Sequence, residues 1–375
     1  MNPTAPPAQA SSGMALPPPR TRVFLIADSP PFHGTQSGPV LYRHLRRLEA
    51  EADVSCLSLV PAPPDYPVAH RMVPPRFPGL VPVRRWLPFS RIINRRQKAA
   101  HLVRTLKLGP ADRLISCLHA REHALARDLS RLSGAPLTCI LHDLWPSSEN
   151  RDAPRTLRQA RSILAVSENL AALAHTFAPG RVERMPPLGE DPLPRIEPPT
   201  GPFRVGVAGT LHPAYLAVAT RLGRPVLALG WKGERPPGVE THPFQRTNLD
   251  ALRLLQRECR ALLIYQSPRD GAYARYSFPS RLVDFVQTGL PVVIVASPET
   301  NLGLWAGEHH WPLWVADESS DAAFEDIARR LDDETQWREA SRCAQALSAG
   351  EFNASRIHRI LVAALRLEEL TKTAP

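Results

Sequence analysis

A proline-dense stretch near the middle of the chain, MPPLGEDPLPRIEPPTGP over residues 185–202, constrains the fold more than any other feature. Proline lacks a backbone N–H and fixes φ, so neither a helix nor a sheet persists through such a run. The stretch therefore predicts a linker between two separately folded halves. At 375 residues the chain is long enough for two α/β domains, each with its own core.

The first half, residues 21–184, alternates short apolar runs with helical patterns. Leu41, Leu45 and Leu48 share one face of a predicted helix, while Arg43 and its arginine neighbours point elsewhere. Strand, glycine-containing loop, helix and strand in that order form a βαβ unit. Ser167 is a natural N-cap for a further helix. The apolar runs typical of buried strands are residues 21–27, 53–59, 114–117, 137–141 and 162–166.

The same pattern restarts beyond the linker, over residues 203–350. Predicted strands cover 203–208, 225–229, 261–265 and 291–295, and predicted helices cover 213–221 and 280–288. The sequence thus predicts two consecutive parallel α/β domains, with no information on strand order. We further expect residues 351–375 to form a helix that packs back on the first domain.

Composition limits the surroundings and the partners of the chain. Residues 1–20 are rich in Pro, Ala and Ser without an apolar h-region, which predicts a disordered leader and not a secretory signal. The five cysteines form no CxxC pair, which favours buried thiols in a reducing compartment such as the cytoplasm. The formal net charge of +10 suits phosphate-bearing ligands or an anionic membrane face.

The most informative motif is YSFPSRLVDFVQTGLPVV, which starts at Tyr276. Ser277 can cap the helix that follows it, and Ser277, Ser280, Arg281 and Asp284 then share one edge. A helix N-terminus with hydroxyls and an arginine suits a diphosphate. An acid one turn further in can accept hydrogen bonds from ribose hydroxyls. A capped amphipathic helix with a surface Arg–Asp pair explains the same pattern.

The string SFPSRLVDFVQTGLPVVI resembles the donor-site helix of GT-B glycosyltransferases related to the large retaining family 4. Weaker similarities cover FRVGVAGTL at 203–211, LTCILHDLWP at 137–146 and ILAVSE at 163–168, in the order the family has them. The resemblance implies the GT-B fold, in which two Rossmann-like domains with parallel sheets face each other and the C-terminal helices return to the first domain.

The resemblance also implies an activity. Such enzymes move a sugar, often with retention, from a nucleotide-diphosphate sugar to a hydroxyl of a saccharide or lipid-linked acceptor in glycan, glycoconjugate or polysaccharide biosynthesis. They require no metal, and we expect no cofactor. Asp284 would hold the ribose, Ser280 and Arg281 would hold the diphosphate, and His142 would face the donor sugar. The remaining donor-binding candidates are Gly38, Gly209, Thr210, Ser277, Phe278 and Pro279.

Three positions depart from the family pattern. Tyr276 stands eight residues before Asp284, where the family has a second acid, and the acid at 284 is one methylene shorter than the usual glutamate. Thr210 replaces the arginine that follows the second-domain glycine. These changes leave a second class open, a non-catalytic GT-B-like nucleotide-binding or scaffold protein.

His142 and Asp143 end an apolar strand, where α/β folds place ligand-binding groups. A histidine there can donate to a sugar hydroxyl and Asp143 can orient it, so these two are the candidate catalytic residues. A strand end with a satisfied histidine is the alternative. His309 and His310 have no third ligand at zinc spacing, so no metal site is expected.

A basic segment runs from Val83 to Lys107, where basic residues alternate with Trp86, Leu87, Phe89, Ile92 and Ile93. These basic residues include Arg84, Arg85, Arg91, Arg95, Arg96 and Lys98. It could dock on an anionic membrane that carries a lipid-linked acceptor, which predicts peripheral attachment at the inner membrane face. A helix with an ordinary solvated basic face explains it equally well. No nucleic-acid recognition motif accompanies the charge, so no nucleic-acid partner is expected.

Overall fold

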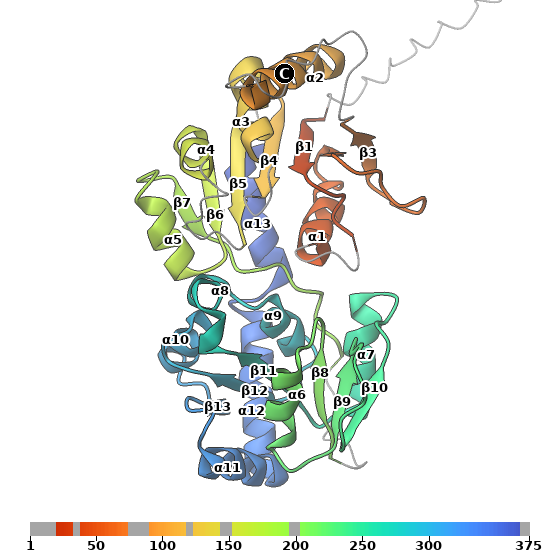
Figure 1. The fold of residues 1–375 in the computed structure, drawn as a ribbon, viewed down its shortest axis with the longest axis vertical. Coiled ribbons are helices and arrows are strands. Elements are labelled where there is room, and N and C mark those ends of the chain that lie inside the picture. The colour runs from red at the N-terminus through yellow and green to blue at the C-terminus, as the bar shows by residue number, and fades with distance from the viewer. Residues whose placement is uncertain are drawn as a thin grey trace, which may run out of the picture.

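The computed structural model describes residues 20–32, 38–73, 90–117, 123–142, 152–194 and 203–367. The described residues form two parallel sheets, one in each half of the chain (Figure 1). The first has seven strands in the order β3-β2-β1-β4-β5-β6-β7, and the second has six in the order β10-β9-β8-β11-β12-β13. The predicted pair of parallel α/β domains is therefore confirmed.

In each sheet the first strand of the half lies in the middle and the chain builds outward in both directions, as in doubly wound folds. The elements of the first half are β1 (Arg22–Ala27), α1 (Gly38–Leu48), β2 (Asp53–Ser58), β3 (Ala69–Met72), α2 (Ser90–Leu106), β4 (Arg113–Cys117), α3 (His123–Ser133), β5 (Leu137–Leu141), α4 (Ala153–Gln159), β6 (Ser162–Ala165), α5 (Glu168–His175) and β7 (Val182–Arg184).

The second half follows the same plan and ends in three helices. Its elements are β8 (Val205–Ala208), α6 (Pro213–Thr220), β9 (Val226–Leu229), β10 (Val239–His242), α7 (Asn248–Glu258), β11 (Ala261–Gln266), the 3-10 turn η2 (Pro268–Asp270), α8 (Ala272–Tyr276), α9 (Ser280–Val286), β12 (Val292–Ala296), α10 (Asn301–Glu308), β13 (Trp314–Val315), α11 (Asp321–Asp332), α12 (Glu334–Ala349) and α13 (Ala354–Leu365).

The last helix, α13, packs on the first sheet although it follows the second in sequence (Figure 1). Its residues Ile357, Leu361 and Leu365 are buried together with side chains of β1 and α1. Arg113 Nε donates to the carbonyl oxygen of Leu365 at 2.7 Å. The chain therefore crosses between the two halves twice, once at residues 185–194 and once between α12 and α13.

The described part of the linker, residues 185–194, contains neither helix nor strand. It is nevertheless tightly packed, because Met185 and Leu188 are fully buried. A Cβ added to Gly189 would lie 2.9 Å from Val283 Cγ1 of α9, so the linker backbone touches that helix directly. Leu193 N donates to the carbonyl oxygen of Gln287 at 2.8 Å. Residues 185–194 are thus held in place by contacts along their length.

Most predicted strands and helices appear within a few residues of the expected positions. The short strands β3, β7, β10 and β13 and the helix α8 were not predicted, because each has too few residues to show a period. The predicted cap at Ser277 is wrong. Ser277 ends α8, and α9 begins after Pro279 with no side-chain cap.

Several predictions lie outside the described residues: the leader up to residue 19, Asp143, residues 34–37, 83–89, 195–202 and 368–375. Among the helices that are described, none is both long and apolar enough to cross a membrane.

The packing of α10 against β12 predicts opposite effects for two glycines. A Cβ on Gly303 would lie 2.0 Å from the carbonyl oxygen of Ser297, which Thr300 Oγ1 holds by a 2.8 Å hydrogen bond. Gly303→Ala should therefore lower the free energy of unfolding by about 1–3 kcal/mol or more. The control Gly307→Ala meets only the Trp314 ring at 3.4 Å and should be neutral or stabilising by up to ~1 kcal/mol. Urea unfolding measures both, and equal stabilities would contradict the packing.

Candidate functional site

The turn after β8 and the helix α9 meet at Gly209 and Arg281. Gly209 has φ of +103°, which only glycine adopts readily. A Cβ placed there would lie 2.9 Å from Arg281 Nε, so the backbone and the guanidinium are in close contact. Arg281 Nη2 donates to the carbonyl oxygen of Thr210 at 3.0 Å. Arg281 is thus brought to two other predicted site residues, the adjacent pair Gly209 and Thr210, the nearer of which is 71 positions away in sequence.

The ring of Tyr215 lies next to the guanidinium of Arg281. The guanidinium carbon of Arg281 lies 5.3 Å from the centre of the Tyr215 ring, a cation–π geometry. Tyr215 is buried, and its hydroxyl donates to the carbonyl oxygen of Leu263 at 3.0 Å. Burial raises the pKa of Tyr215, so the phenol stays neutral. A half-buried arginine beside an aromatic ring presents the planar fork that suits phosphate oxygens.

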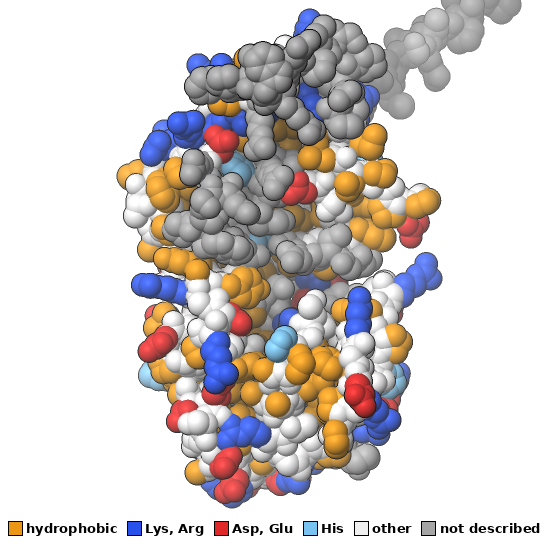
Figure 2. Space-filling model, viewed as in Figure 1, with side chains coloured by type: hydrophobic (Ala, Val, Ile, Leu, Met, Phe, Trp, Pro, Cys, Tyr) orange, Lys and Arg blue, Asp and Glu red, His pale blue; other side chains and the backbone are white. Residues whose placement is uncertain are grey.

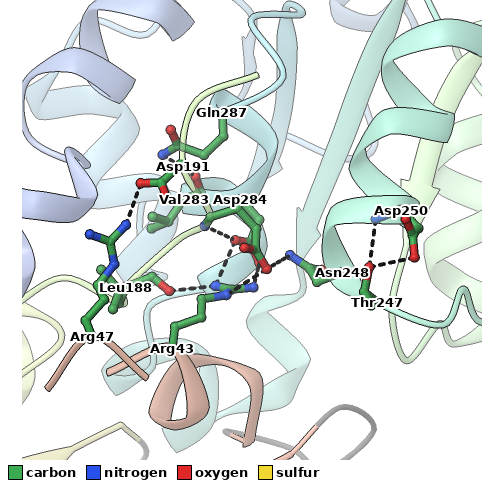
Figure 3. Close-up of polar contacts among 11 residues, drawn as sticks. Arg43, Arg47, Leu188, Asp191, Thr247, Asn248, Asp250, Val283, Asp284 and Gln287 are labelled. Atoms are coloured by element: carbon green, nitrogen blue, oxygen red, sulfur yellow. Dashed lines mark hydrogen bonds and ion pairs between the residues drawn. The ribbon is translucent and has the colours of Figure 1, made fainter. Parts of the chain in front are cut away.

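Asp284, the predicted ribose ligand, is buried with 8% of its surface exposed. Its Oδ1 lies 2.9 Å from Arg43 Nη1, and its Oδ2 accepts from Arg43 Nη2 at 3.2 Å (Figure 3). The backbone N–H of Glu190 also donates to Oδ1 at 3.2 Å. Burial raises the pKa of Asp284 and the Arg43 charge opposes that rise. We hold that Asp284 is ionised near neutral pH, because both of its oxygens accept hydrogen bonds from donors.

Arg43 reaches this acid from the first domain. It lies on α1 and is itself buried, with 8% exposed. Its Nε donates to Glu190 Oε1 at 2.9 Å and its Nη1 to the carbonyl oxygen of Leu188 at 2.6 Å (Figure 3). One guanidinium therefore joins α1, the linker and α9, and we call these residues (Arg43, Leu188, Glu190 and Asp284) the junction.

The other residues of the donor motif are spread over different environments. Phe278 is buried, and its ring packs against Trp305 and Phe352 at centroid distances of 6.0 and 5.9 Å. Ser277 is also buried, and its carbonyl oxygen accepts from Gln266 Nε2 at 3.2 Å. Pro279 and Ser280 are half-buried at the start of α9. Phe278 and Ser277 thus lie in the core of the second domain.

The two first-domain candidates that the structure describes lie near α1. His142 follows β5 directly and is 6% exposed. It lies within electrostatic reach of His44, which is on α1 next to Arg43 in sequence. Gly38 is the first residue of α1 and is buried. The candidate catalytic partner Asp143 lies outside the described residues.

The domains also meet at the opposite end of the motif. Ser167 caps α5, as predicted, by accepting from Leu170 N at 3.1 Å. Its hydroxyl donates to the carbonyl oxygen of Tyr276 at 2.6 Å, and Asn169 Nδ2 donates to that of Arg275 at 2.8 Å. The position where the family has its second acid therefore contributes its backbone to a contact between domains.

Arg43 and Glu190 were not identified from the sequence. Arg43 stands in the run RHLRR, where all three arginines lie off the leucine face and nothing in the sequence distinguishes the buried one. Glu190 stands in the proline-rich linker, which has no periodicity.

Comparison with known proteins defines the class of fold. No protein-family model matches the chain, and no curated protein matches it in sequence. Among solved structures it is similar to a glycosyltransferase from Rickettsia africae ESF-5, with 9% identity, TM-score 0.65 and coverage of 95% of this chain and 100% of that one. It is also similar to WaaG, a glycosyltransferase involved in lipopolysaccharide biosynthesis, with 12% identity, TM-score 0.56 and coverage of 92% and 98%.

A third similar structure is TarM, with 6% identity, TM-score 0.65 and coverage of 92% of this chain and 98% of that one. These three similarities each cover 92% or more of this chain. The chain therefore has the two-domain GT-B fold, as the motif resemblance implied.

The buried histidine beside the junction predicts a pH dependence of stability. His44 is 1% exposed, and burial together with His358, His142, Arg43 and Arg47 holds its pKa well below the usual value. The unfolded chain binds a proton at His44 below about pH 6.5 and the folded chain does not, so stability falls on acidification.

We expect the free energy of unfolding to decrease between about pH 7 and 5 by up to ~1.4 kcal/mol per pH unit from His44. His44→Leu should flatten this slope, whereas the same change at exposed His175 should not. Urea titrations across this pH range measure the slope, and an unchanged slope in His44→Leu would contradict the assignment.

Proposed function

We propose that this protein is a glycosyltransferase that moves a sugar from a nucleotide-diphosphate donor to an acceptor hydroxyl in glycoconjugate biosynthesis. The observation that carries the proposal is the contact between Gly209 and Arg281, which joins the two donor motifs at the end of β8. Ligands of open α/β sheets bind outside the carboxyl ends of the strands, where this contact lies. The solved structures of the same fold named above are glycosyltransferases.

In this proposal Arg281 and the backbone at Gly209 and Thr210 bind the diphosphate. One N–H of Arg281 already donates to the Thr210 carbonyl oxygen, and its guanidinium lies over the ring of Tyr215. Such a preset cation stabilises the negative charge that develops on the departing diphosphate as the bond to the anomeric carbon breaks. Ser280, at the start of α9, adds a hydroxyl beside the phosphate position.

The acceptor side of the proposal rests on the first domain. His142 lies at the carboxyl end of β5 and would donate a hydrogen bond to a hydroxyl of the donor sugar, oriented by Asp143. Among the site residues that the structure describes none is a strong general base, which fits attack of the acceptor from the side that the diphosphate leaves and hence retention. The acceptor is then a saccharide or lipid-linked hydroxyl.

One observation favours a second candidate, a GT-B-like protein that binds nucleotides or partners without catalysis. The carboxylate of Asp284 is engaged by Arg43 and Glu190, and Tyr276 stands where the family has an acid. Turnover separates the two candidates. A panel of UDP-, GDP-, ADP- and TDP-sugars is assayed for release of nucleoside diphosphate, and at least one donor should show transfer or hydrolysis. The absence of turnover with every donor would favour the non-catalytic protein.

Removal of Arg281 should abolish donor binding. Because hydrogen bonds between a guanidinium and phosphate are worth about 1.5–3 kcal/mol, Arg281→Gln should weaken the nucleoside diphosphate that binds best by at least about tenfold. Arg275→Gln, an exposed arginine on the neighbouring helix α8, is the matched control and should bind like the wild type. Calorimetric titration measures both, and equal affinities in all three proteins would refute the diphosphate site.

A peripheral location at an anionic membrane is part of the proposal. The helix α2 forms the described part of the basic segment, and Arg96, Arg104 and Ile93 are exposed on it. Arg95 is not available for lipid, because it pairs with Asp128 at 2.6 Å and with Asp152 at 3.3 Å. On the face shown in Figure 2, charges of both signs are interspersed over the second domain, so that face offers no uniformly basic surface.

Charge reversal on α2 tests the proposed binding to an anionic membrane. Each basic side chain at an anionic surface contributes about 1 kcal/mol, so Arg96→Glu with Arg104→Glu should reduce binding to phosphatidylserine vesicles by more than about tenfold. Arg253→Glu with Arg257→Glu on α7 makes the same change in net charge and should bind as the wild type does. Vesicle sedimentation measures both, and parallel losses would leave only net charge as the explanation.

A further inference from the structure

The junction fills most of the hydrogen-bonding capacity of Asp284. A carboxylate offers about four lone-pair positions, and a ribose that binds through both vicinal hydroxyls uses two of them. Arg43 Nη2 and Glu190 N each donate a hydrogen bond to Asp284 at 3.2 Å. Arg43 Nη1, which donates to the Leu188 carbonyl oxygen, lies 2.9 Å from Oδ1 as an ion-pair contact and occupies the space beside it. The Asp284 side chain is 11% exposed, so the remaining position is nearly closed to ligands.

The donors at Asp284 differ in how easily they could leave. Glu190 N belongs to the linker, whose backbone at Gly189 packs against Val283, so its position is fixed. Arg43 arrives from α1 on a long flexible stem and has alternative acceptors in Glu190 Oε1 and the Leu188 carbonyl. Departure of Arg43 would therefore free the positions beside both oxygens of Asp284. Arg43 itself would remain paired with Glu190 and the Leu188 carbonyl oxygen.

We propose that Arg43 is an intramolecular competitor for the acid of the nucleotide site, so that the Arg43–Asp284 ion pair and a bound ribose exclude one another. The inference rests on the nucleotide site proposed above. With Arg43 on Asp284, the first domain is tied to α9 and only the diphosphate contacts are open. A ribonucleotide that takes Asp284 releases Arg43 and, with it, the link between α1 and the second domain.

The proposed competition predicts that removal of Arg43 increases the affinity for a nucleotide. The apparent affinity of a ligand falls with the fraction of protein that can accept it, so removal of a competing side chain tightens binding. Arg43→Gln should bind the best of UDP, GDP and ADP roughly tenfold more tightly than the wild type does. The 2′,3′-dideoxy form of the same nucleotide has no hydroxyls for Asp284, and its affinity should not change.

Arg47 provides the matched control for removal of an arginine from α1. It lies one turn after Arg43 and pairs with Asp191 of the same linker without touching Asp284 (Figure 3). Arg47→Gln should leave the affinities for both forms of the nucleotide at their wild-type values. If Arg43→Gln does not fold, Arg43→Lys keeps the charge but replaces the two-pronged fork by a single ammonium, and it should give an intermediate tightening.

Calorimetric titration of these variants distinguishes the outcomes. Tighter binding of the ribonucleotide by Arg43→Gln, with unchanged binding of the dideoxy form, supports the competition. Equal or weaker ribonucleotide binding by Arg43→Gln overturns it and leaves the proposed donor site standing. Equal tightening of both nucleotide forms overturns it as well, because Arg43 would then act on the domain arrangement and not on Asp284. If no nucleotide binds to any variant, the inference falls together with the proposed function.

Discussion

The buried ion pair between Arg43 and Asp284 is the interaction on which the relation of the two domains depends. Both side chains are nearly removed from water, which costs several kcal/mol for each charge before any attraction is counted. The two ionic contacts and the hydrogen bonds from Glu190 N and to the Leu188 carbonyl offset that cost. Loss of one partner would leave the other charge buried and uncompensated, a penalty of about 3–5 kcal/mol. A contact of this kind gives geometric specificity more than net stability.

The position of this pair explains the path of residues 185–194, the described part of the linker. Residues 185–194 contain neither helix nor strand, so their backbone groups need other partners. The Leu188 carbonyl and Glu190 N find them in Arg43 and Asp284, and Leu193 N finds one in Gln287. Hydrogen bonds to charged side chains from both domains thus determine the path of residues 185–194. Its prolines prevent secondary structure, but the junction determines where it runs.

The sequence was sufficient to predict the fold, whereas the roles of the site residues stay predictions. Strands of four to six apolar residues and the proline stretch identified the two parallel halves, because buried parallel strands have continuous apolar runs. The resemblance to the donor motif placed Gly209 and Arg281 at the same diphosphate, and the structure brings these two residues into contact. Arg43 could not be predicted, since its partner is 241 residues away and its helix face carries two similar arginines. The burial of Phe278 likewise depends on ring contacts from α10 and the chain before α13.

The shorter acid at position 284 is consistent with its surroundings. A carboxylate one methylene closer to α9 lies within reach of the linker backbone, which packs against that helix at Gly189. The reach across the domain boundary is then supplied by the long side chain of Arg43, whose planar fork contacts both oxygens of Asp284 at once while its Nε contacts Glu190. A lysine could not satisfy these acceptors together. Charge at Asp284 therefore serves the domain arrangement first. In the function proposed here recognition of phosphate is the role of Arg281, which forms no ion pair with an acid among the described residues.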